Sequence, residues 1–542
     1  MSQRALKNSL KRSYNAFLSR PDELADKAGS TKAATNWLVQ YRRQHHQDPI
    51  YGEIPLEPYQ MTIAESPHFC RLRGLRQMGA AHYVFTNAHH TRFSHSIGVA
   101  HLAKRMYRHV VAQSERETYS AFEEMFVVTA AMCHDLGHGP HSHAFERYAK
   151  DFDHEEMSVR LLENAMKTGQ FEFICNEPFT YERGFESDIP ADDETEDCET
   201  TDFSVCGAAV GAHSSSKQIA NVPAEKHTRE ETIRINLAIL RAMVQGVSVD
   251  DAAMLLPRHK YWLFEIVHNT KHGIDVDKMD YLMRDVHAVY GAVNANVRIE
   301  HIIQSVRIVK GHLRFHVCSC NQLYELLYLR ASLYKNVYTN DSVVSVERMF
   351  LDLLHMVDDE NDKCITKAIK SVDRFLLLDD SVFSAWATLR NADRNGQLWT
   401  LARRIQTHDF YSVVARRTFR QTKRPTSRVC SIDSVLTAYE QEYGCNDRSI
   451  FNADSLFVHT SRYDLGNGPN DPLKETVFYL DTQESGPIEC NRDGHTSCFY
   501  ENEQSTEYLV RLYCKTSLAS IDDAKLKQLM RVFGRLLEAE GD

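Results

Sequence analysis

Apolar residues recur at three- and four-residue steps along much of the chain, which is the spacing of helices that bury one face. The pattern is dense between Asp48 and Cys175, and in AFEEMFVVTAAMCHDLG it continues from Phe122 to Leu136. It resumes in IRINLAILRAMVQG from Ile233 and continues through YWLFEIVHN, VDKMDYLMRDVHAVYG and NQLYELLYLRASLYKNVY. The pattern therefore predicts a mainly α-helical core.

Short strand candidates appear in the C-terminal part of the chain. After residue 345, helical runs alternate with polar loops, and TVFYLDT and EYLVRLYC are rich in residues typical of strands. We therefore expect a mainly α protein with a helical core domain over residues 46–345. A smaller, mixed α+β region over residues 346–542 would then serve regulation or assembly.

Two segments lack the apolar residues that a core needs. Residues 186–227 are first acidic and then small and polar, so they cannot bury enough surface to offset chain entropy, and we predict a disordered insertion. Residues 1–45 form a basic extension, whose first 21 residues carry five basic side chains and no acidic one. Such a composition is typical of a mitochondrial presequence and equally of a solvated tail on a nuclear or cytoplasmic protein, so we expect an intracellular location in either case.

Charge and cysteine content exclude several classes of protein. The chain has 63 Lys and Arg against 74 Asp and Glu, a net charge of −11, which gives no general attraction for nucleic acid. No segment approaches the ~20 continuous apolar residues of a membrane span. Thirteen cysteines without a paired CxxC framework indicate reduced thiols.

The apolar helix predicted from Phe122 ends in His134-Asp135, and this pair is the first sign of chemistry. Imidazole and carboxylate together suit a borderline divalent cation such as manganese, iron or zinc. Neighbouring residues point about 100° apart on a regular helix, so two adjacent ligands require a helix end or a local distortion. Further ligands must come from elsewhere, and His95 in TRFSHSIGVAHLAKRM and Asp277 in HGIDVDKMDYLMRD are the candidates.

The segment that follows Asp277 has the pattern of a pocket wall. On a helix, Asp277, Tyr281 and Asp285 lie on one stripe at four-residue steps, with Arg284 beside them. Apolar residues cover the opposite side. An ordinary solvated face would favour Lys and Glu, so the stripe indicates a binding surface.

The order His, His-Asp, Asp resembles that of the HD metal-dependent phosphohydrolases. Longer stretches are similar to the SAM-and-HD-domain deoxynucleoside triphosphate triphosphohydrolases, namely DPIYGEI, RLRGLRQMGAAHYVFTNAHHTRFSHSIGVAHLA, CHDLGHGPHSHAFE, DHEEMS and NTKHGIDVDKMDYLMRD. The resemblance covers residues 45–345. The basic extension before it is too short for a SAM domain.

The resemblance implies a role for each matching residue. The metal ligands would be His95, His134, Asp135 and Asp277. The catalytic group would be His154 with Glu146 as the acid that orients it, and His138. The phosphates would be contacted by Arg92, His143, Lys278, Tyr281 and Arg330, and the sugar by Gln77, Met78, Asp285 and Tyr338.

The implied reaction is hydrolysis of a dNTP to deoxynucleoside and inorganic triphosphate, which controls dNTP pools. It would use a divalent metal at the HD site and magnesium on the nucleotide phosphates. Two alternatives stay open at this point. One is an HD phosphohydrolase acting on a cyclic nucleotide, a nucleoside monophosphate or an alarmone, and the other is a non-catalytic binding module.

The resemblance also implies a homo-oligomer, dimer or tetramer, switched on by GTP or a dNTP. Glu65 and Arg73 match the activator segment, but Cys70 stands where the family pattern has glutamine. A thiol lacks the paired donor and acceptor that an amide presents to a guanine edge. This departure argues against activation by guanine nucleotide.

Overall fold

The computed structural model describes residues 45–180, 227–291, 297–382, 396–420, 425–426, 431–444, 447, 449–466, 473, 478–480 and 506–539. The predicted basic extension and the predicted insertion lie outside the described residues, apart from His45 and His227. Their character and the predicted domain boundaries stay predictions.

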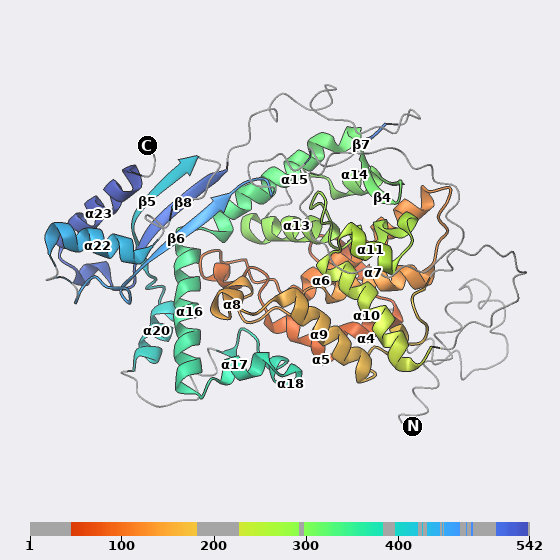
Figure 1. Ribbon diagram of the computed structural model, residues 1–542, viewed down its shortest axis with the longest axis horizontal. Coiled ribbons are helices and arrows are strands. Elements are labelled where there is room, and N and C mark those ends of the chain that lie inside the picture. Colours follow the sequence, from red (N-terminus) through yellow and green to blue (C-terminus); the bar gives the residue numbers. More distant parts are fainter. Residues whose placement is uncertain are drawn as a thin grey trace, which may run out of the picture.

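The described chain is mainly α-helical, as the pattern predicted (Figure 1). Its α-helices are α4 (Pro58–Ala64), α5 (Pro67–Cys70), α6 (Arg92–Ala112), α7 (Ala121–Cys133), α8 (His143–Tyr148), α9 (His154–Lys167), α10 (Arg229–Gln245), α11 (Val249–Leu255), α12 (Trp262–Glu265), α13 (Val276–Tyr290), α14 (Ile299–Gln304), α15 (Cys320–Leu333), α16 (Asp341–Glu360), α17 (Cys364–Ile369), α18 (Val372–Phe375), α20 (Gln397–Gln406), α22 (Ile432–Tyr443) and α23 (Asp523–Glu538). Among the described residues, none of these helices is long and apolar enough to cross a membrane.

The strands form three small sheets. They are β1 (His45–Asp48), β2 (Gly52–Pro55), β3 (Val306–Val309), β4 (His312–His316), β5 (Ser412–Arg420), β6 (Leu456–Tyr463), β7 (Phe478–Tyr479) and β8 (Glu507–Cys514). The first two make an antiparallel hairpin. In the second sheet, β4 is the middle strand and pairs antiparallel with β3 and parallel with β7. In the third sheet, β8 lies antiparallel between β5 and β6. The prediction of a strand in EYLVRLYC is confirmed over its whole length, whereas in TVFYLDT the described strand is two residues long.

Helix α7 begins and ends for local reasons that bear on the site. The Ser120 side chain accepts a hydrogen bond from the Glu123 amide and caps the first turn. In that turn, the negative charges of Glu123 and Glu124 stabilise the positive end of the helix dipole. All residues of α7 from Glu123 to Cys133 are buried. The helix ends at Cys133, which leaves His134 at its C-cap, as the sequence predicted.

Helix α13 is bounded equally sharply. The Asp275 side chain accepts from the Lys278 amide at the N-terminus, and Gly291 ends the helix at φ 72°, in the left-handed conformation that glycine adopts without strain. Helix α6 packs against both α7 and α13. The start of α6, the end of α7 and the start of α13 therefore meet.

The buried apolar residues form two clusters. The larger one fills the helical body and reaches Phe457 and Tyr513 of the C-terminal sheet. The smaller one lies between that sheet and helices α22 and α23. Figure 1 shows α16 running between the C-terminal sheet and the helical body.

Candidate active site

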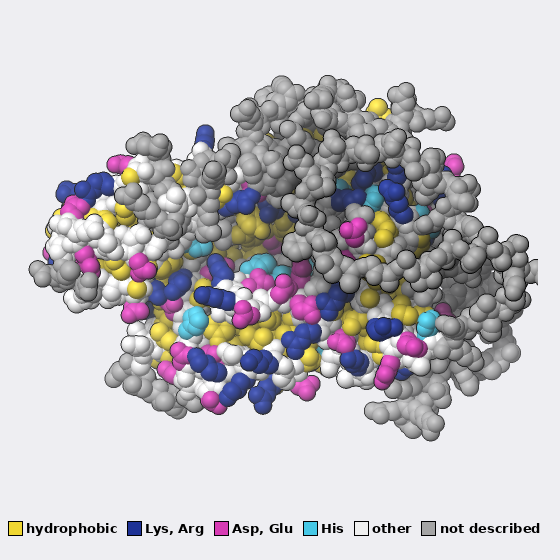
Figure 2. Space-filling view, viewed as in Figure 1, with side chains coloured by type: hydrophobic (Ala, Val, Ile, Leu, Met, Phe, Trp, Pro, Cys, Tyr) yellow, Lys and Arg dark blue, Asp and Glu magenta, His cyan; other side chains and the backbone are white. Residues whose placement is uncertain are grey.

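A cavity of about 880 Å³ opens between the ends of these helices. In Figure 2, histidine side chains gather near the centre of the visible face with acidic and basic side chains around them. Most of the side chains predicted from the sequence line this cavity: Gln77, Met78, Arg92, His95, Asp135, His138, His143, Glu146, His154, Asp277, Lys278, Tyr281, Asp285, Arg330 and Tyr338.

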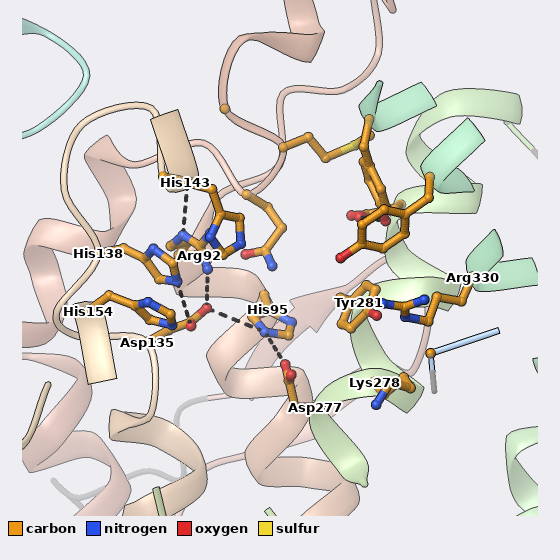
Figure 3. A pocket seen from close by; sticks show the side chains of 18 of the residues that line it. Arg92, His95, Asp135, His138, His143, His154, Asp277, Lys278, Tyr281 and Arg330 are labelled. Atoms are coloured by element: carbon orange, nitrogen blue, oxygen red, sulfur yellow. Dashed lines mark hydrogen bonds and ion pairs between the residues drawn. The ribbon is translucent and has the colours of Figure 1, made fainter. Parts of the chain in front are cut away.

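His95, His134 and Asp277 form a compact group in which one ligand atom from each lies within 4.8 Å of the others. Oδ1 of Asp277 is 3.0 Å from Nε2 of His95 (Figure 3). The same oxygen is 3.3 Å from Nε2 of His134. Both Nε2 atoms are buried without a hydrogen-bond partner in the described structure. Two orphaned imidazole nitrogens that face one carboxylate fit a divalent cation.

The opposite nitrogen of each imidazole is fixed by a neighbour. Nδ1 of His95 lies 2.8 Å from Oδ2 of Asp280, and Nδ1 of His134 lies 2.8 Å from the carbonyl oxygen of Ala131. Because both neighbours are acceptors, each Nδ1 carries a proton and directs Nε2 at the group. Burial lowers the pKa of His95, but the facing carboxylates of Asp277, Asp280 and Asp135 outweigh burial and raise it to about 10. A cation binds only the deprotonated nitrogen, so binding would release a proton.

Behind His95 lies a chain of buried ion pairs. Arg284 donates from Nε and Nη2 to Asp280, both at 2.9 Å, and from Nη1 to Asp48 at 2.8 Å. A Cβ at Gly98 would clash with Asp280, so glycine at this position of α6 lets the carboxylate approach His95. Asp280 and Arg284 are 0% and 1% exposed, so the chain holds His95 from within the core.

Asp135 lies between the His95–His134–Asp277 group and a second group of histidines that includes His138. Its Oδ2 accepts from Nη1 of Arg92 at 2.5 Å and lies 3.5 Å from Nε2 of His95, while its Oδ1 lies 3.2 Å from Nε2 of His138. Burial raises the pKa of Asp135, but the Arg92 guanidinium and the adjacent imidazoles hold it well below its usual range. The carboxylate is therefore ionised and links the two groups.

The second group is His138, His143 and His154, arranged around Glu146. Oε2 of Glu146 lies 2.9 Å from Nδ1 of His143, and Oε1 makes a short hydrogen bond with Nδ1 of His154. The rings of His138 and His154 stack with centroids 3.9 Å apart and planes 21° from parallel. Burial lowers the pKa of His154, but the bond to Glu146 and the charge of Asp135 outweigh it and raise the pKa.

Comparison with known proteins decides the class of this site. The family model described as HD domain matches residues 92–240. This segment of the chain is thus similar to an HD domain. It is 24% identical to the deoxynucleoside triphosphate triphosphohydrolase SAMHD1 of Bos taurus, over 93% of this chain and 80% of the relative.

Two further relatives bear the same description. The SAMHD1 homolog of Dictyostelium discoideum is 25% identical, over 91% of this chain and 80% of its own length. The Homo sapiens protein is 24% identical, over 86% of this chain and 70% of its own length. The resemblance drawn from the motifs is thereby confirmed, and together with the HD domain it supports a metal-dependent phosphohydrolase.

Residues after the matched HD segment complete the cavity. The Asp285 carboxylate is held by Nε2 of His90 at 2.7 Å and by the Tyr338 hydroxyl, which donates at 2.5 Å. Tyr338 ends a π-helical turn, Tyr334–Tyr338, that continues α15. Such turns recur at functional sites because they re-aim side chains.

The cationic side of the cavity is Lys278 and Arg330. The Lys278 ammonium donates to the Gly273 carbonyl, and the Arg330 guanidinium lies 4.4 Å from the Tyr334 ring centroid. Nη1 of Arg330 donates to the Asp464 carbonyl at 3.4 Å, just before Leu465 and Gly466, which also line the cavity.

Sequence reasoning missed several of these residues. Asp280 lies four residues before Arg284 on α13, the spacing of a helical acid–base pair, and this was the one local signal available. Asp48 and His90 stand in stretches that carry the resemblance, but nothing in those stretches marks their contacts with α13. Asp464 reaches the site from a distant segment that no local pattern marks.

The residues matched to the activator segment lie outside the cavity lining. Glu65 and Arg73 are exposed, and Arg73 places its guanidinium 3.5 Å from the Phe93 ring centroid. The half-buried Cys70 thiol donates to the Ala64 carbonyl at 3.3 Å.

Proposed function

We propose that this protein is a metal-dependent triphosphohydrolase that cleaves dNTPs to deoxynucleoside and inorganic triphosphate and so controls dNTP pools. The observation that carries the proposal is one cavity in which a group suited to a divalent cation lies beside cationic side chains and a histidine–carboxylate pair. The family name borne by the relatives agrees with it.

The metal would be held by His95, His134, Asp135 and Asp277, with manganese, iron or zinc as the fitting ions. When bound, it supplies a Lewis acid and lowers the pKa of water, and magnesium would accompany the nucleotide phosphates. Asp280 keeps His95 in the tautomer that can serve such an ion.

The triphosphate would be bound by fixed positive charge. Arg92, Lys278 and Arg330 line the cavity with the Tyr281 hydroxyl and with His143 at its exposed edge. Helices α6, α9 and α13 begin at the cavity, and helix N-termini favour anions. Such preorganised donors stabilise charge that develops on the phosphate oxygens.

His154 would protonate the 5′-oxygen of the leaving deoxynucleoside. Glu146 holds its Nδ1 and raises its pKa, which favours the charged ring, whose Nε2 carries the proton to be delivered. His138, stacked on the ring, fixes its plane.

The sugar would lie against Gln77, Met78, Asp285 and Tyr338. The Tyr338–Asp285–His90 hydrogen bonds fix this wall. A fixed wall in close contact with C2′ disfavours a ribose hydroxyl, which selects deoxynucleotides over ribonucleotides.

Product analysis by ion-exchange chromatography tests the proposal. The four dNTPs and four NTPs are incubated with manganese or magnesium, each with and without GTP. We expect deoxynucleoside and intact triphosphate from dNTPs. Asp277→Asn is the inactive control, and Glu163→Gln on the exposed face of α9 is the matched carboxylate control.

Each outcome has a distinct meaning. Release of monophosphate or orthophosphate in place of triphosphate would move the protein to another HD phosphohydrolase reaction. Products that form only with GTP would establish guanine activation despite Cys70. Light scattering of the same samples would decide between the proposed dimer and tetramer and show whether nucleotide changes it.

A further inference from the structure

The segment that contains α18 and the turn after it, residues 372–382, lies against the loops that carry the site. It follows the HD motif by more than two hundred residues, and no motif marks it. The Asp380 side chain nevertheless accepts from the backbone amides of Arg76 and His141, and the Leu378 carbonyl accepts from the Arg71 side chain, all next to the proposed metal and sugar residues.

Arg71 is the first link between this segment and the site. Its buried guanidinium donates from Nε to the Leu378 carbonyl at 2.7 Å, from Nη1 to the Leu136 carbonyl at 3.2 Å and from Nη2 to the His138 carbonyl at 2.6 Å. The guanidinium also lies 4.4 Å from the Phe375 ring centroid. One cation thus ties the residues just after His134-Asp135 to the 372–382 segment.

Asp380 is the second link, and it holds two loops at once. Its Oδ2 accepts from the Arg76 amide at 2.7 Å and its Oδ1 accepts from the His141 amide at 2.7 Å. Its own amide donates to the Gly74 carbonyl at 3.1 Å. Arg76 precedes Gln77, which lines the proposed sugar site.

The loop at His141 needs such an anchor. His141 and Ser142 both have φ of 56°, a left-handed conformation that costs free energy in residues with a side chain. Ser142 donates from Oγ to the Arg76 carbonyl and accepts from Nε of Arg92, both at 3.0 Å. The strained loop therefore sets the position of Arg92, the proposed phosphate ligand.

We propose that Asp380 is a positioning residue that clamps the Arg76 and His141 loops together and so holds the sugar wall and Arg92 in register. This inference rests on the proposed function for the identity of the substrate. The clamp contacts none of the proposed metal ligands, so its loss leaves metal content unchanged while nucleotide binding weakens.

The test compares Asp380→Asn with Asp379→Asn. An amide in place of Asp380 can accept from one of the two backbone amides only, and its NH₂ faces the other donor. The Asp379 side chain accepts from the backbone amide and the hydroxyl of Ser381 and, in the described structure, bonds to neither the Arg76 nor the His141 amide. Its charge also faces the Arg71 guanidinium, so Asp379→Asn is the matched control for the loss of a carboxylate charge at this place without loss of the two amide bonds. Asp380→Glu keeps the charge but moves it by one methylene, and it serves if the asparagine variant does not fold.

Hydrogen exchange of the Arg76 and His141 amides is the readout that needs no activity. We expect exchange in Asp380→Asn to rise about 10-fold at one or both amides, and KM for the dNTP to rise about 10-fold with bound metal retained. Asp379→Asn should change none of these quantities.

Two results would overturn the inference. One is unchanged exchange at both amides, and the other is raised exchange with wild-type KM and kcat, which would leave Asp380 a purely structural role. If the wild-type protein hydrolyses no dNTP, the proposed function fails instead. Exchange together with calorimetric binding of inorganic triphosphate then still decides whether the clamp exists and positions Arg92.

Discussion

Two groups of side chains lie at the cavity, His95–His134–Asp277 and His138–His143–His154. Within each group the possible ligand atoms lie within 4.8 Å of one another, but the two groups are built differently. In the first, His95 is 1% exposed and the nitrogen facing away from the group is held by Asp280. In the second, the His143 side chain is 69% exposed, and Glu146 is the partner of both His143 and His154.

The difference shows that residue type alone does not define a metal site. The first group directs two Nε2 atoms at one carboxylate oxygen. In the second group, the stacked rings of His138 and His154 cannot both direct an in-plane lone pair at an ion between them. The geometry therefore supports the proposal that the first group binds the metal and the second transfers the proton.

Removal of one imidazole from each group should give the largest effect, and it tests which group binds the metal. His134→Ala should lose bound metal, and turnover should fall by about 10⁴-fold, because several kcal/mol of charge stabilisation disappear. His143→Ala should retain its metal. Metal content is measured by mass spectrometry after dialysis, and metal loss in His143→Ala alone would reverse the assignment.

Substitution at His154 separates proton transfer from metal binding. His154→Gln should lower kcat by about 10³-fold, the contribution of a positioned general acid, with normal metal content. Turnover of a dNTP analogue with a better leaving group should recover part of the rate. Equal losses for both substrates would show that His154 does not deliver the proton.

The ion-pair chain behind His95 predicts a smaller effect on the first group. Arg284→Met should weaken metal affinity about 10- to 100-fold, because Asp280 loses the partner that orients it toward His95. Arg105→Met removes an exposed ion pair with Glu300 on the same helical body and serves as control. Competition with a fluorescent chelator gives both affinities.

The pH profile tests the second group most finely. Burial raises the pKa of Glu146, but its bonds to His143 and His154 outweigh burial and hold the pKa well below its ordinary 4.5. The pKa of His154 is raised above its ordinary 6.5. Activity that needs charged His154 should fall as pH rises through that raised pKa. Glu146→Gln should shift this alkaline limb to lower pH, and an unmoved limb would assign the titration to another group.

The same shifts predict how the pair affects stability. Its stabilisation is greatest between about pH 4.5 and 6.5, where Glu146 is ionised and His154 is charged even in the unfolded chain. It is lost as pH falls through the folded-state pKa of Glu146 or rises through that of His154. Thermal unfolding of Glu146→Gln across pH should therefore differ most from wild type inside this window.

The sequence was most informative where the chemistry is local. His134-Asp135 could be placed at a helix end because the apolar pattern stops there, and Asp277, Tyr281 and Asp285 could be placed on one wall because helical spacing aligns them. The fold class followed from the same periodicity.

The rest depends on contacts between distant segments. Asp380 reaches Arg76 over 304 residues and His141 over 239, and a single sequence carries no signal of that proximity. The positive φ at His141 and Ser142 was equally hidden, because neither residue is glycine, which adopts such a conformation without strain.

The Asp48–Arg284 ion pair has a consequence for how the chain folds. Its partners are 236 residues apart, so the pair forms only after a long loop has closed, a cost that delays non-local contacts relative to nearby helices. During synthesis, His95 and His134 leave the ribosome well before α13 exists. The nascent chain therefore carries three of its four proposed metal ligands before it has Asp277, which completes the set, and Asp280, which orients His95. The site matures only when β1 has docked on α13.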